Sequence, residues 1–326
     1  MAEHAFNTYI PINSIPEYQN FSYNFDYVTI IMLFNFICLF PTLFATTKTV
    51  LHYSKHANQN SQGGIHPYVF KSFVYMQISS LVYTVFDYII DRIPSTSVVT
   101  SYFSTMKSDS PVKYAVAAYY LFEYLYQLLT VLFCLMRLLV FIDLKNQLKI
   151  TCLTFHFWPI ISTIICVIAS IPHCLYGAVA IQLDVPFQYG AIVFTTTLNF
   201  TSRTQTLGKF FFSVVLSILI IMMTFMMLLK LNNLKRLSSI SNRNLKAETT
   251  LTITMFLILI PTVLNQIITV SSMFAPMYAS YSILLRLTLM DCRVNIVSWY
   301  FYWTHPYFKK KTTVTNSLNI KVTIIT

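Results

Sequence analysis

The sequence predicts an all-α membrane protein, a seven-transmembrane helix bundle with its N-terminus outside the cell and its C-terminus inside. Of the 326 residues, 56% are hydrophobic and only 10% are charged, whereas about 25% of an ordinary soluble domain is charged. Seven apolar stretches reach the length of about 20 residues that a helix needs to cross a bilayer. Most lysines and arginines fall in alternate loops, which is the pattern of the cytoplasmic side.

The predicted spans are separated by loops too short to hold a soluble domain. They lie near Tyr27–Leu51, Pro67–Ile90, Lys113–Ile142, Leu153–Leu175, Leu207–Leu231, Thr249–Phe274 and Tyr281–Thr304. The chain is therefore expected to divide into an extracellular N-terminal segment (1–26), a transmembrane bundle (27–304) and a cytoplasmic tail (305–326).

Two independent patterns predict the orientation. Of the 22 lysines and arginines, fifteen lie on the side of the C-terminus, five lie on the other side, including Arg92 in the first outer loop, and two, Arg286 and Arg293, lie inside the seventh span. The two N-x-[ST] sequons, at Asn20 and Asn199, both fall on the side with few basic residues, where glycosylation takes place. Both patterns place the N-terminus outside.

The composition also excludes several functions. The formal charge of +11 suggests nucleic acid in a soluble protein, but here it is an orientation signal, and no nucleic-acid partner is expected. No GxGxxG or GxxxxGK[ST] string is present to hold a nucleotide. No nucleophile, base and orienting group combine into a catalytic site, so an enzyme, a metal site and a cofactor are not predicted.

The first two spans contain one residue of interest. The first span must direct insertion itself, because Met1–Asn20 has no Lys or Arg and no apolar run. The second carries Asp87 near its outer end. A charge at membrane depth is costly and therefore faces the bundle interior, pairs with a partner or lines a cavity. Asp87 is a candidate ligand contact on this ground.

The third span carries an acid at the depth of a pocket floor. Glu123 lies about 15 Å below the outer end of the span at 1.5 Å per residue, with Tyr124 and Gln127 close by in the sequence. One interpretation is a ligand-contacting group. The other is an ion pair with Arg286 or Arg293 that holds helices together, and the sequence leaves both open.

The inner ends of the third and fifth spans are basic. Arg137 ends the third span, where it could engage a G protein, as the arginine of rhodopsin-like receptors does, or extend to lipid phosphates. Lys235 and Arg236 follow the fifth span. They could bind a transducer, but an ordinary positive inner loop explains them equally well.

The fourth span contains two prolines, Pro159 and Pro172, which membrane helices tolerate.

The sixth span contains a proline and two amides. Pro261, midway along the span, removes a backbone hydrogen bond and is either the pivot for an inner-end swing or a site of static packing. Asn265 and Gln266 could complete the ligand pocket or hydrogen-bond between helices.

The seventh span carries further polar residues. Asp291 and Asn295 are four residues apart and share one helix face, which suits a polar hinge. Asp291 could equally be neutralised by a neighbouring arginine, and the two interpretations are compatible. The acids Asp87, Glu123 and Asp291 outnumber the two arginines of the spans, so the spans together carry a net charge of −1.

Several separate motifs resemble those of the nematode serpentine chemoreceptors of class U (Sru), over nearly the whole chain. The motifs are Pro16-Glu17-Tyr18 with Phe21 and Asn24-Phe25, Arg92-Ile93-Pro94 with Thr100-Ser101, Lys246-Ala247-Glu248 with Leu251-Thr252-Ile253-Thr254-Met255, and Asp291-Cys292 followed by Trp299-Tyr300-Phe301-Tyr302-Trp303-Thr304-His305-Pro306-Tyr307-Phe308-Lys309-Lys310. The chain departs from the family at Ser298, where proline is usual, and at Phe103 and Ala180, where cysteines are usual. This is consistent with the loss of one outer disulfide.

The resemblance implies a chemosensory G-protein-coupled receptor in the plasma membrane of a sensory cell, surrounded by membrane lipid. Its expected partners are a small chemical ligand, bound in the outer half of the bundle, and a heterotrimeric G protein. Two other classes stay open: a ligand-gated cation channel, and a seven-span partner that helps other receptors to traffic without signalling itself.

Overall fold

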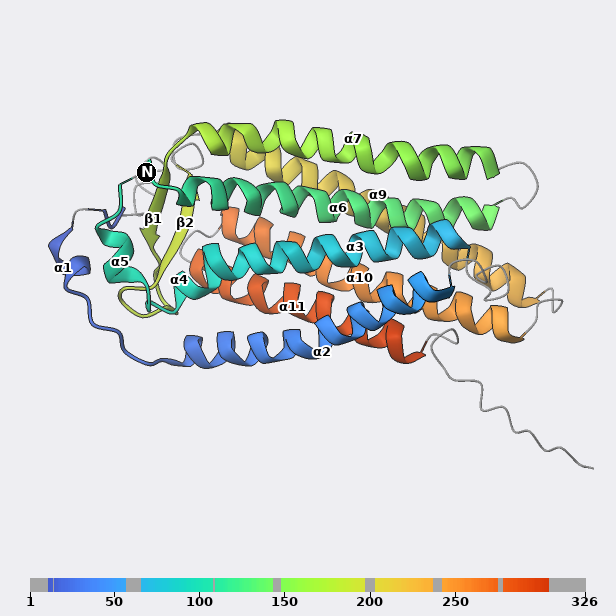
Figure 1. Ribbon diagram of the computed structural model, residues 1–326, viewed down its shortest axis with the longest axis horizontal. Coiled ribbons are helices and arrows are strands. Elements are labelled where there is room, and N and C mark those ends of the chain that lie inside the picture. The colour runs from blue at the N-terminus through green and yellow to red at the C-terminus, as the bar shows by residue number, and fades with distance from the viewer. Residues whose placement is uncertain are drawn as a thin grey trace, which may run out of the picture.

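The computed structural model describes residues 11–13, 15–56, 66–107, 109–142, 148–196, 203–236, 242–274 and 278–304. Within these ranges, long helices run side by side in a single bundle (Figure 1). They are α2 (Tyr27–His56), α3 (Pro67–Asp87), α6 (Val112–Ile142), α7 (Leu148–Leu175), α9 (Arg203–Arg236), α10 (Asn242–Phe274) and α11 (Ala279–Thr304). Each contains most or all of one predicted span.

Six of these helices are long and apolar enough to cross a membrane within the described residues. The apolar segments are Tyr27–His52, Pro67–Ser95, Val112–Val140, Lys149–Leu175, Leu207–Lys230 and Glu248–Val270. The helix α11 has the required length but is not among the six, and it carries Arg286, Asp291 and Arg293. The structure is thus mostly helical, with six of the seven predicted spans apolar enough to cross a membrane, and the apolar character predicted for the seventh span is not matched.

The second span is longer than the sequence predicted. The helix α3 continues without a break into a π-helical turn, η3 (Tyr88–Arg92), and a short helix, α4 (Ile93–Ser95). The prediction ended this span at Ile90 and placed Arg92 in an outer loop, and that placement is wrong. A π-turn is a wide turn that often occurs at functional sites, and here Arg92 is only 1% exposed.

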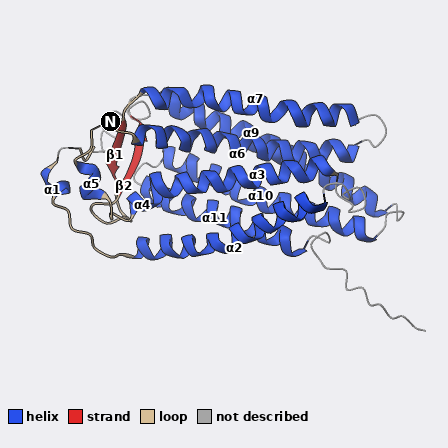
Figure 2. Cartoon of the chain, viewed as in Figure 1, coloured by secondary structure: helices blue, strands red, loops and turns tan. Residues whose placement is uncertain are grey.

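One end of the bundle is covered by a β-hairpin, which the search for long apolar stretches did not predict. The strands β1 (Ala178–Gln182) and β2 (Ile192–Thr196) lie side by side (Figure 2) and pair antiparallel. In this register Ala180 is opposite Phe194. Each strand has only five residues and lies in the loop between the fourth and fifth spans. We call this end of the bundle the hairpin end.

The N-terminal segment packs onto the same hairpin. Pro11 forms a β-bridge with Ile181, and the backbone N–H of Ile12 donates to the carbonyl of Ala180 at 3.1 Å. The short helices α1 (Pro16–Gln19) and α5 (Thr100–Ser104) lie beside it (Figure 1). We call residues 11–13 and 15–26, together with the hairpin, the hairpin cap. It closes this end of the bundle with backbone hydrogen bonds and buried side chains such as Ile12.

Gly190 lies where the hairpin cap is most tightly packed. Its φ of 91° is in the left-handed region, and a Cβ atom would lie 2.4 Å from the ring of Phe21. We expect Gly190→Ala to destabilise the protein by about 1–3 kcal/mol, because alanine is strained at this φ and the ring must move. The measurement is the thermal unfolding midpoint of the purified protein.

Gly208 in α9 provides the matched control for this substitution. A Cβ atom there meets nothing within 4 Å, and alanine is favoured over glycine inside a helix by about 1 kcal/mol. Gly208→Ala should therefore leave the unfolding midpoint unchanged or raise it slightly. Equal midpoints for the two variants would contradict the close packing of Phe21 on Gly190.

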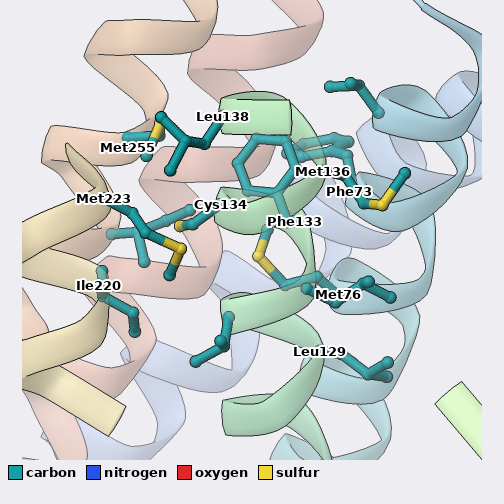
Figure 3. Packing of buried hydrophobic residues seen from close by; sticks show 14 of the residues in the cluster. Phe73, Met76, Leu129, Phe133, Cys134, Met136, Leu138, Ile220, Met223 and Met255 are labelled. Atoms are coloured by element: carbon teal, nitrogen blue, oxygen red, sulfur yellow. The ribbon is translucent and has the colours of Figure 1, made fainter. Parts of the chain in front are cut away.

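The main apolar core lies in the other half of the bundle. Phe133 of α6 stands between Phe73 on the α3 side and Met223 on the α9 side (Figure 3). The rings of Phe73 and Phe301 stack with centroids 4.0 Å apart, which ties α11 into the same cluster. This packing fixes α3, α6, α9 and α11 relative to one another, and so positions the polar groups described below.

Candidate functional site

Three charged side chains meet inside the bundle near the hairpin end. Arg92 donates through Nε to Asp87 Oδ2 and through Nη1 to Asp291 Oδ2, and the guanidinium lies over the ring of Tyr88 at 4.5 Å. All three charged side chains are at most 3% exposed. Arg92 lies in the continuation of α3, so it joins this helix to α11.

The arginine beside Asp291 is Arg92. Two compatible interpretations were predicted for Asp291, a polar hinge and an ion pair with a neighbouring arginine, and the structure has an ion pair with Arg92. Arg92 itself was missed because it was assigned to an outer loop. The net charge of −1 computed for the spans was the available signal that another cation belonged inside the bundle.

Glu123 forms a second ion pair. Arg286 of α11 donates through Nη2 to Glu123 Oε1 at 2.7 Å, and their side chains are 33% and 15% exposed, respectively. The sequence left open whether Glu123 contacts a ligand or forms an ion pair, and in the structure it forms an ion pair with Arg286. This contact connects α6 to α11 about one helical turn from the polar cavity described below.

A double-mutant cycle measures whether this pair is structural. We expect Glu123→Gln and Arg286→Gln each to lower the unfolding free energy, and the double variant to lose less than the sum, with a coupling of about 0.5–3 kcal/mol. Denaturation of the purified protein gives the four unfolding free energies of the cycle. Additive losses would mean that Glu123 and Arg286 do not stabilise one another.

A small polar cavity lies between α6, α9, α10 and α11. Its lining residues are Tyr126, Gln127, Ser213, Leu216, Ser217, Ile220, Thr262, Asn265, Gln266, Met290 and Arg293. The free volume is about 10 Å³, which is room for about one water molecule. The structure thus brings together Gln127, Asn265 and Gln266 of the predicted pocket.

The other predicted pocket residues lie outside this lining. Asp87 and Glu123 are held in ion pairs, and Tyr124 packs edge-on against Phe212 of α9 with ring centroids 5.3 Å apart. Arg293 lines the cavity although it was not predicted as a site residue. Its Nη2 donates to Thr130 Oγ1 at 2.8 Å.

A second polar cluster joins α2, α3 and α11 on the far side of the triad from the hairpin. Thr42 donates to Asn295 Oδ1 at 2.6 Å, and Ser298 donates to Gln77 Oε1 at 3.0 Å. Asn295, predicted as an activation residue, therefore bonds to α2, whereas Asp291 on the same face bonds to Arg92. The two residues do not share one network.

The opposite end of the bundle has its own buried arginine. Nη2 of Arg137 donates to the Glu248 carbonyl at 2.8 Å, to Glu248 Oε2 at 3.1 Å and to Thr252 Oγ1 at 2.7 Å. Arg137 is 2% exposed, so the interpretation that it extends to lipid phosphates is wrong. The contact fastens α6 to α10, and we call it the Arg137–Glu248 lock.

The remaining predicted residues fall as follows. Pro261 is buried within α10, which continues through it as one helix. Asn20 is exposed at the end of α1, in the hairpin cap. The side chains of Lys235 and Arg236, and the whole of Asn199, lie outside the described part of the chain.

The two positions where the resemblance led us to expect cysteines are close to one another in the cap. The rings of Phe103 and Phe194 meet edge-on with centroids 4.5 Å apart, and Ala180 is the cross-strand partner of Phe194. All three residues belong to one apolar cluster. An aromatic contact therefore joins the segment after the second span to the hairpin at this place.

The long apolar helices, which bury ion pairs and a polar cavity between them, are those of a multi-pass membrane protein. The family model of the serpentine seven-transmembrane chemoreceptors Sru matches residues 12–311, and the chain belongs to this family. No curated protein is found to match it. The protein is thus a membrane chemoreceptor.

Proposed function

We propose that this chemoreceptor resides in the plasma membrane of a sensory cell, binds a small chemical cue in the half of the bundle nearer the hairpin, and activates a heterotrimeric G protein. One observation supports this most strongly. The helix α10 contributes Asn265 and Gln266 to the polar cavity and Glu248 to the Arg137–Glu248 lock, with Pro261 between them. A single helix thus connects a pocket to the opposite face of the bundle.

The proposed orientation places the hairpin end outside the cell. The distribution of lysine and arginine along the sequence supports it, and Asn20 of the first sequon is exposed at this end. Its glycosylation would give a cheap test, since only a luminal sequon is modified. The alternative function, a ligand-gated cation channel of the insect odorant-receptor type, should have its N-terminus inside the cell, so glycosylation of Asn20 would exclude it.

The proposed mechanism is a shift between two arrangements of α10. In the arrangement seen here, the lock holds the inner end of α10 against α6. A ligand can favour the unlocked arrangement only if it binds that arrangement more tightly. A differential affinity of about 1–3 kcal/mol, typical of allosteric coupling, changes the equilibrium about 5- to 150-fold. Pro261 lacks the N–H that would stiffen the helix at this level, which supports its role as the pivot.

The proposed ligand contacts are Gln127, Asn265 and Gln266, whereas Asp87, Glu123 and Tyr124 position the helices around them. Asn295 and Asp291 join α11 to α2 and α3, so they would transmit the change. Lys235 and Arg236 remain candidates for the G-protein face because they follow the inner end of the fifth span.

A ligand screen tests the proposed function. Cells that express the full chain and a promiscuous G protein are exposed to a broad chemical panel, and second-messenger release is recorded. Surface labelling confirms that the receptor reaches the plasma membrane. We expect at least one compound to trigger release only in cells with the receptor. No response across the panel from a receptor at the surface would count against G-protein coupling.

A pair of adjacent residues locates the pocket once a compound is found. Asn265→Leu removes a lining amide and is expected to weaken potency by about tenfold, the value of one hydrogen bond of about 1.4 kcal/mol. Leu264→Ala changes the neighbouring residue, which is 39% exposed on the outside of the bundle, and should leave potency within about threefold. Equal effects of both variants would place the ligand elsewhere.

A further inference from the structure

Arg293 differs from the other described arginines of the bundle. Among the four arginine side chains that the structure describes, Arg92 pairs with two carboxylates, Arg137 with Glu248 and Arg286 with Glu123. Arg293 has no carboxylate within 4 Å in the described part of the chain, although it is only 6% exposed. A buried charge is normally paired directly with a charge of opposite sign, and among the described residues no carboxylate takes that place beside Arg293.

The contacts of Arg293 do not supply that charge. Its Nη2 donates to the neutral hydroxyl of Thr130 at 2.8 Å, and its guanidinium lies 5.0 Å from the ring centroid of Tyr126. Neither partner carries a negative charge. Arg293 also lines the polar cavity, so an anion that enters the cavity can reach it.

Two buried groups of the lining are hydrogen-bond acceptors that lack a donor among the described residues. The amide oxygens Asn265 Oδ1 and Gln266 Oε1 are buried and have no hydrogen-bond partner among the described residues. The hydroxyls of Ser217 and Thr262 donate to carbonyls of their own helices at 2.8 and 2.7 Å, which leaves their oxygen lone pairs for another donor. A complementary molecule therefore carries a negative charge and a hydrogen-bond donor.

From this arrangement we infer that the cue bound between α6, α9, α10 and α11 is a small organic carboxylate that also carries a hydroxyl or N–H group. The carboxylate accepts hydrogen bonds from Arg293, whose planar guanidinium matches two carboxylate oxygens. The hydroxyl or N–H donates to the amide oxygens of Asn265 and Gln266. The inference names the ligand of the proposed receptor function and rests on it for its signalling consequence, but binding itself is measured without a G protein.

The present cavity is too small for such a molecule. Its free volume of about 10 Å³ admits about one water molecule, so α9 and α10 must separate when the carboxylate binds. Asn265 lies one helical turn from Pro261 on α10, on the side toward the hairpin. The ligand therefore favours an arrangement in which α10 has moved away from α9. Because α10 also carries Glu248 of the Arg137–Glu248 lock, the ligand has a different affinity for the locked and unlocked arrangements.

Thermal unfolding of the purified full-length receptor tests the inference. The probes are lactate, 3-hydroxybutyrate and 4-hydroxybenzoate, each compared with its primary amide and with the acid that lacks the hydroxyl, at constant chloride and pH 7. At least one hydroxy acid should raise the unfolding midpoint in a saturable manner. Its Kd should be at least about 30-fold lower than that of the amide, the loss expected when a buried charge is left unpaired, and lower than that of the deoxy acid.

Variants then assign the charge to Arg293. Arg293→Gln should abolish the preference for the acid over its amide, and Arg293→Lys should keep part of it because the charge is retained. Lys71→Gln also removes one positive charge, but at the start of α3, and should leave the Kd within about threefold. A preference for acids that survives in Arg293→Gln, or the absence of any preference in the unmodified receptor, would overturn the inference.

The result is separable from the proposed function. Binding of a carboxylate through Arg293, without nucleotide exchange by any G protein, would leave this inference standing and refute the signalling proposal. A G-protein response to neutral compounds alone, with no carboxylate bound, would support the signalling proposal and refute the inference of a carboxylate ligand.

Discussion

Arg92→Gln is expected to reduce the folded receptor at the cell surface to a small fraction of the unmodified level. The substitution leaves the carboxylates of Asp87 and Asp291 buried near one another without a cation. Removing one partner of a buried ion pair costs about 3–5 kcal/mol, a large share of the 5–15 kcal/mol by which native proteins are typically stable. Surface labelling and the yield of detergent-stable receptor measure the loss.

A charge-free triad provides the control for this prediction. In the triple variant Asp87→Asn, Arg92→Gln and Asp291→Asn, no buried charge is left unpaired, and neutral amides of similar size can hydrogen-bond to one another. Since neutral replacement of a buried charge cluster is often close to neutral in stability, surface expression should return to a large part of the original level. If the single variant already reaches that level, the triad does not hold α3 to α11.

Glu248→Gln is expected to raise the ligand-free rate of guanine-nucleotide exchange by about 5- to 50-fold, within the range of typical allosteric coupling. The substitution removes the charge that faces Arg137 across the lock, at a contact of 3.1 Å. The arrangement with α10 held against α6 is then less favoured. Binding of a GTP analogue to membranes, normalised to surface receptor, measures the effect.

Thr252→Val tests the same lock through its second side-chain contact. Arg137 Nη2 also donates to Thr252 Oγ1 at 2.7 Å, and loss of this neutral hydrogen bond should raise the ligand-free rate by less than loss of the charge. An increase for neither variant would mean that the lock does not restrain the signalling arrangement.

The long helices were predictable because a bilayer imposes a length and a composition on every segment that crosses it. The first span was predicted to start at Tyr27, where α2 begins, and the last was predicted to end at Thr304, where α11 ends. The hairpin was not predicted because its strands have only five residues each, and apolar stretches of this length cannot be distinguished from an ordinary loop by sequence pattern.

The partners of the buried charges were harder to predict than the charges themselves. Glu123 had two candidate arginines seven residues apart on one helix, and the rotation of α11 that selects Arg286 depends on packing across the whole bundle. Arg92 was hidden because a π-turn extends its helix beyond the expected end. The convergence of Gln127 with Asn265, by contrast, followed from polar residues at similar depth in two spans.

The most direct test of the central proposal is guanine-nucleotide exchange by a purified heterotrimeric G protein with the purified receptor in a lipid disc, with and without a compound that binds. The proposal predicts that the compound accelerates exchange through the unmodified receptor and that Glu248→Gln does so without it. A compound that raises the unfolding midpoint of the receptor, while the exchange rates of every available G protein stay unchanged with both forms, would contradict it.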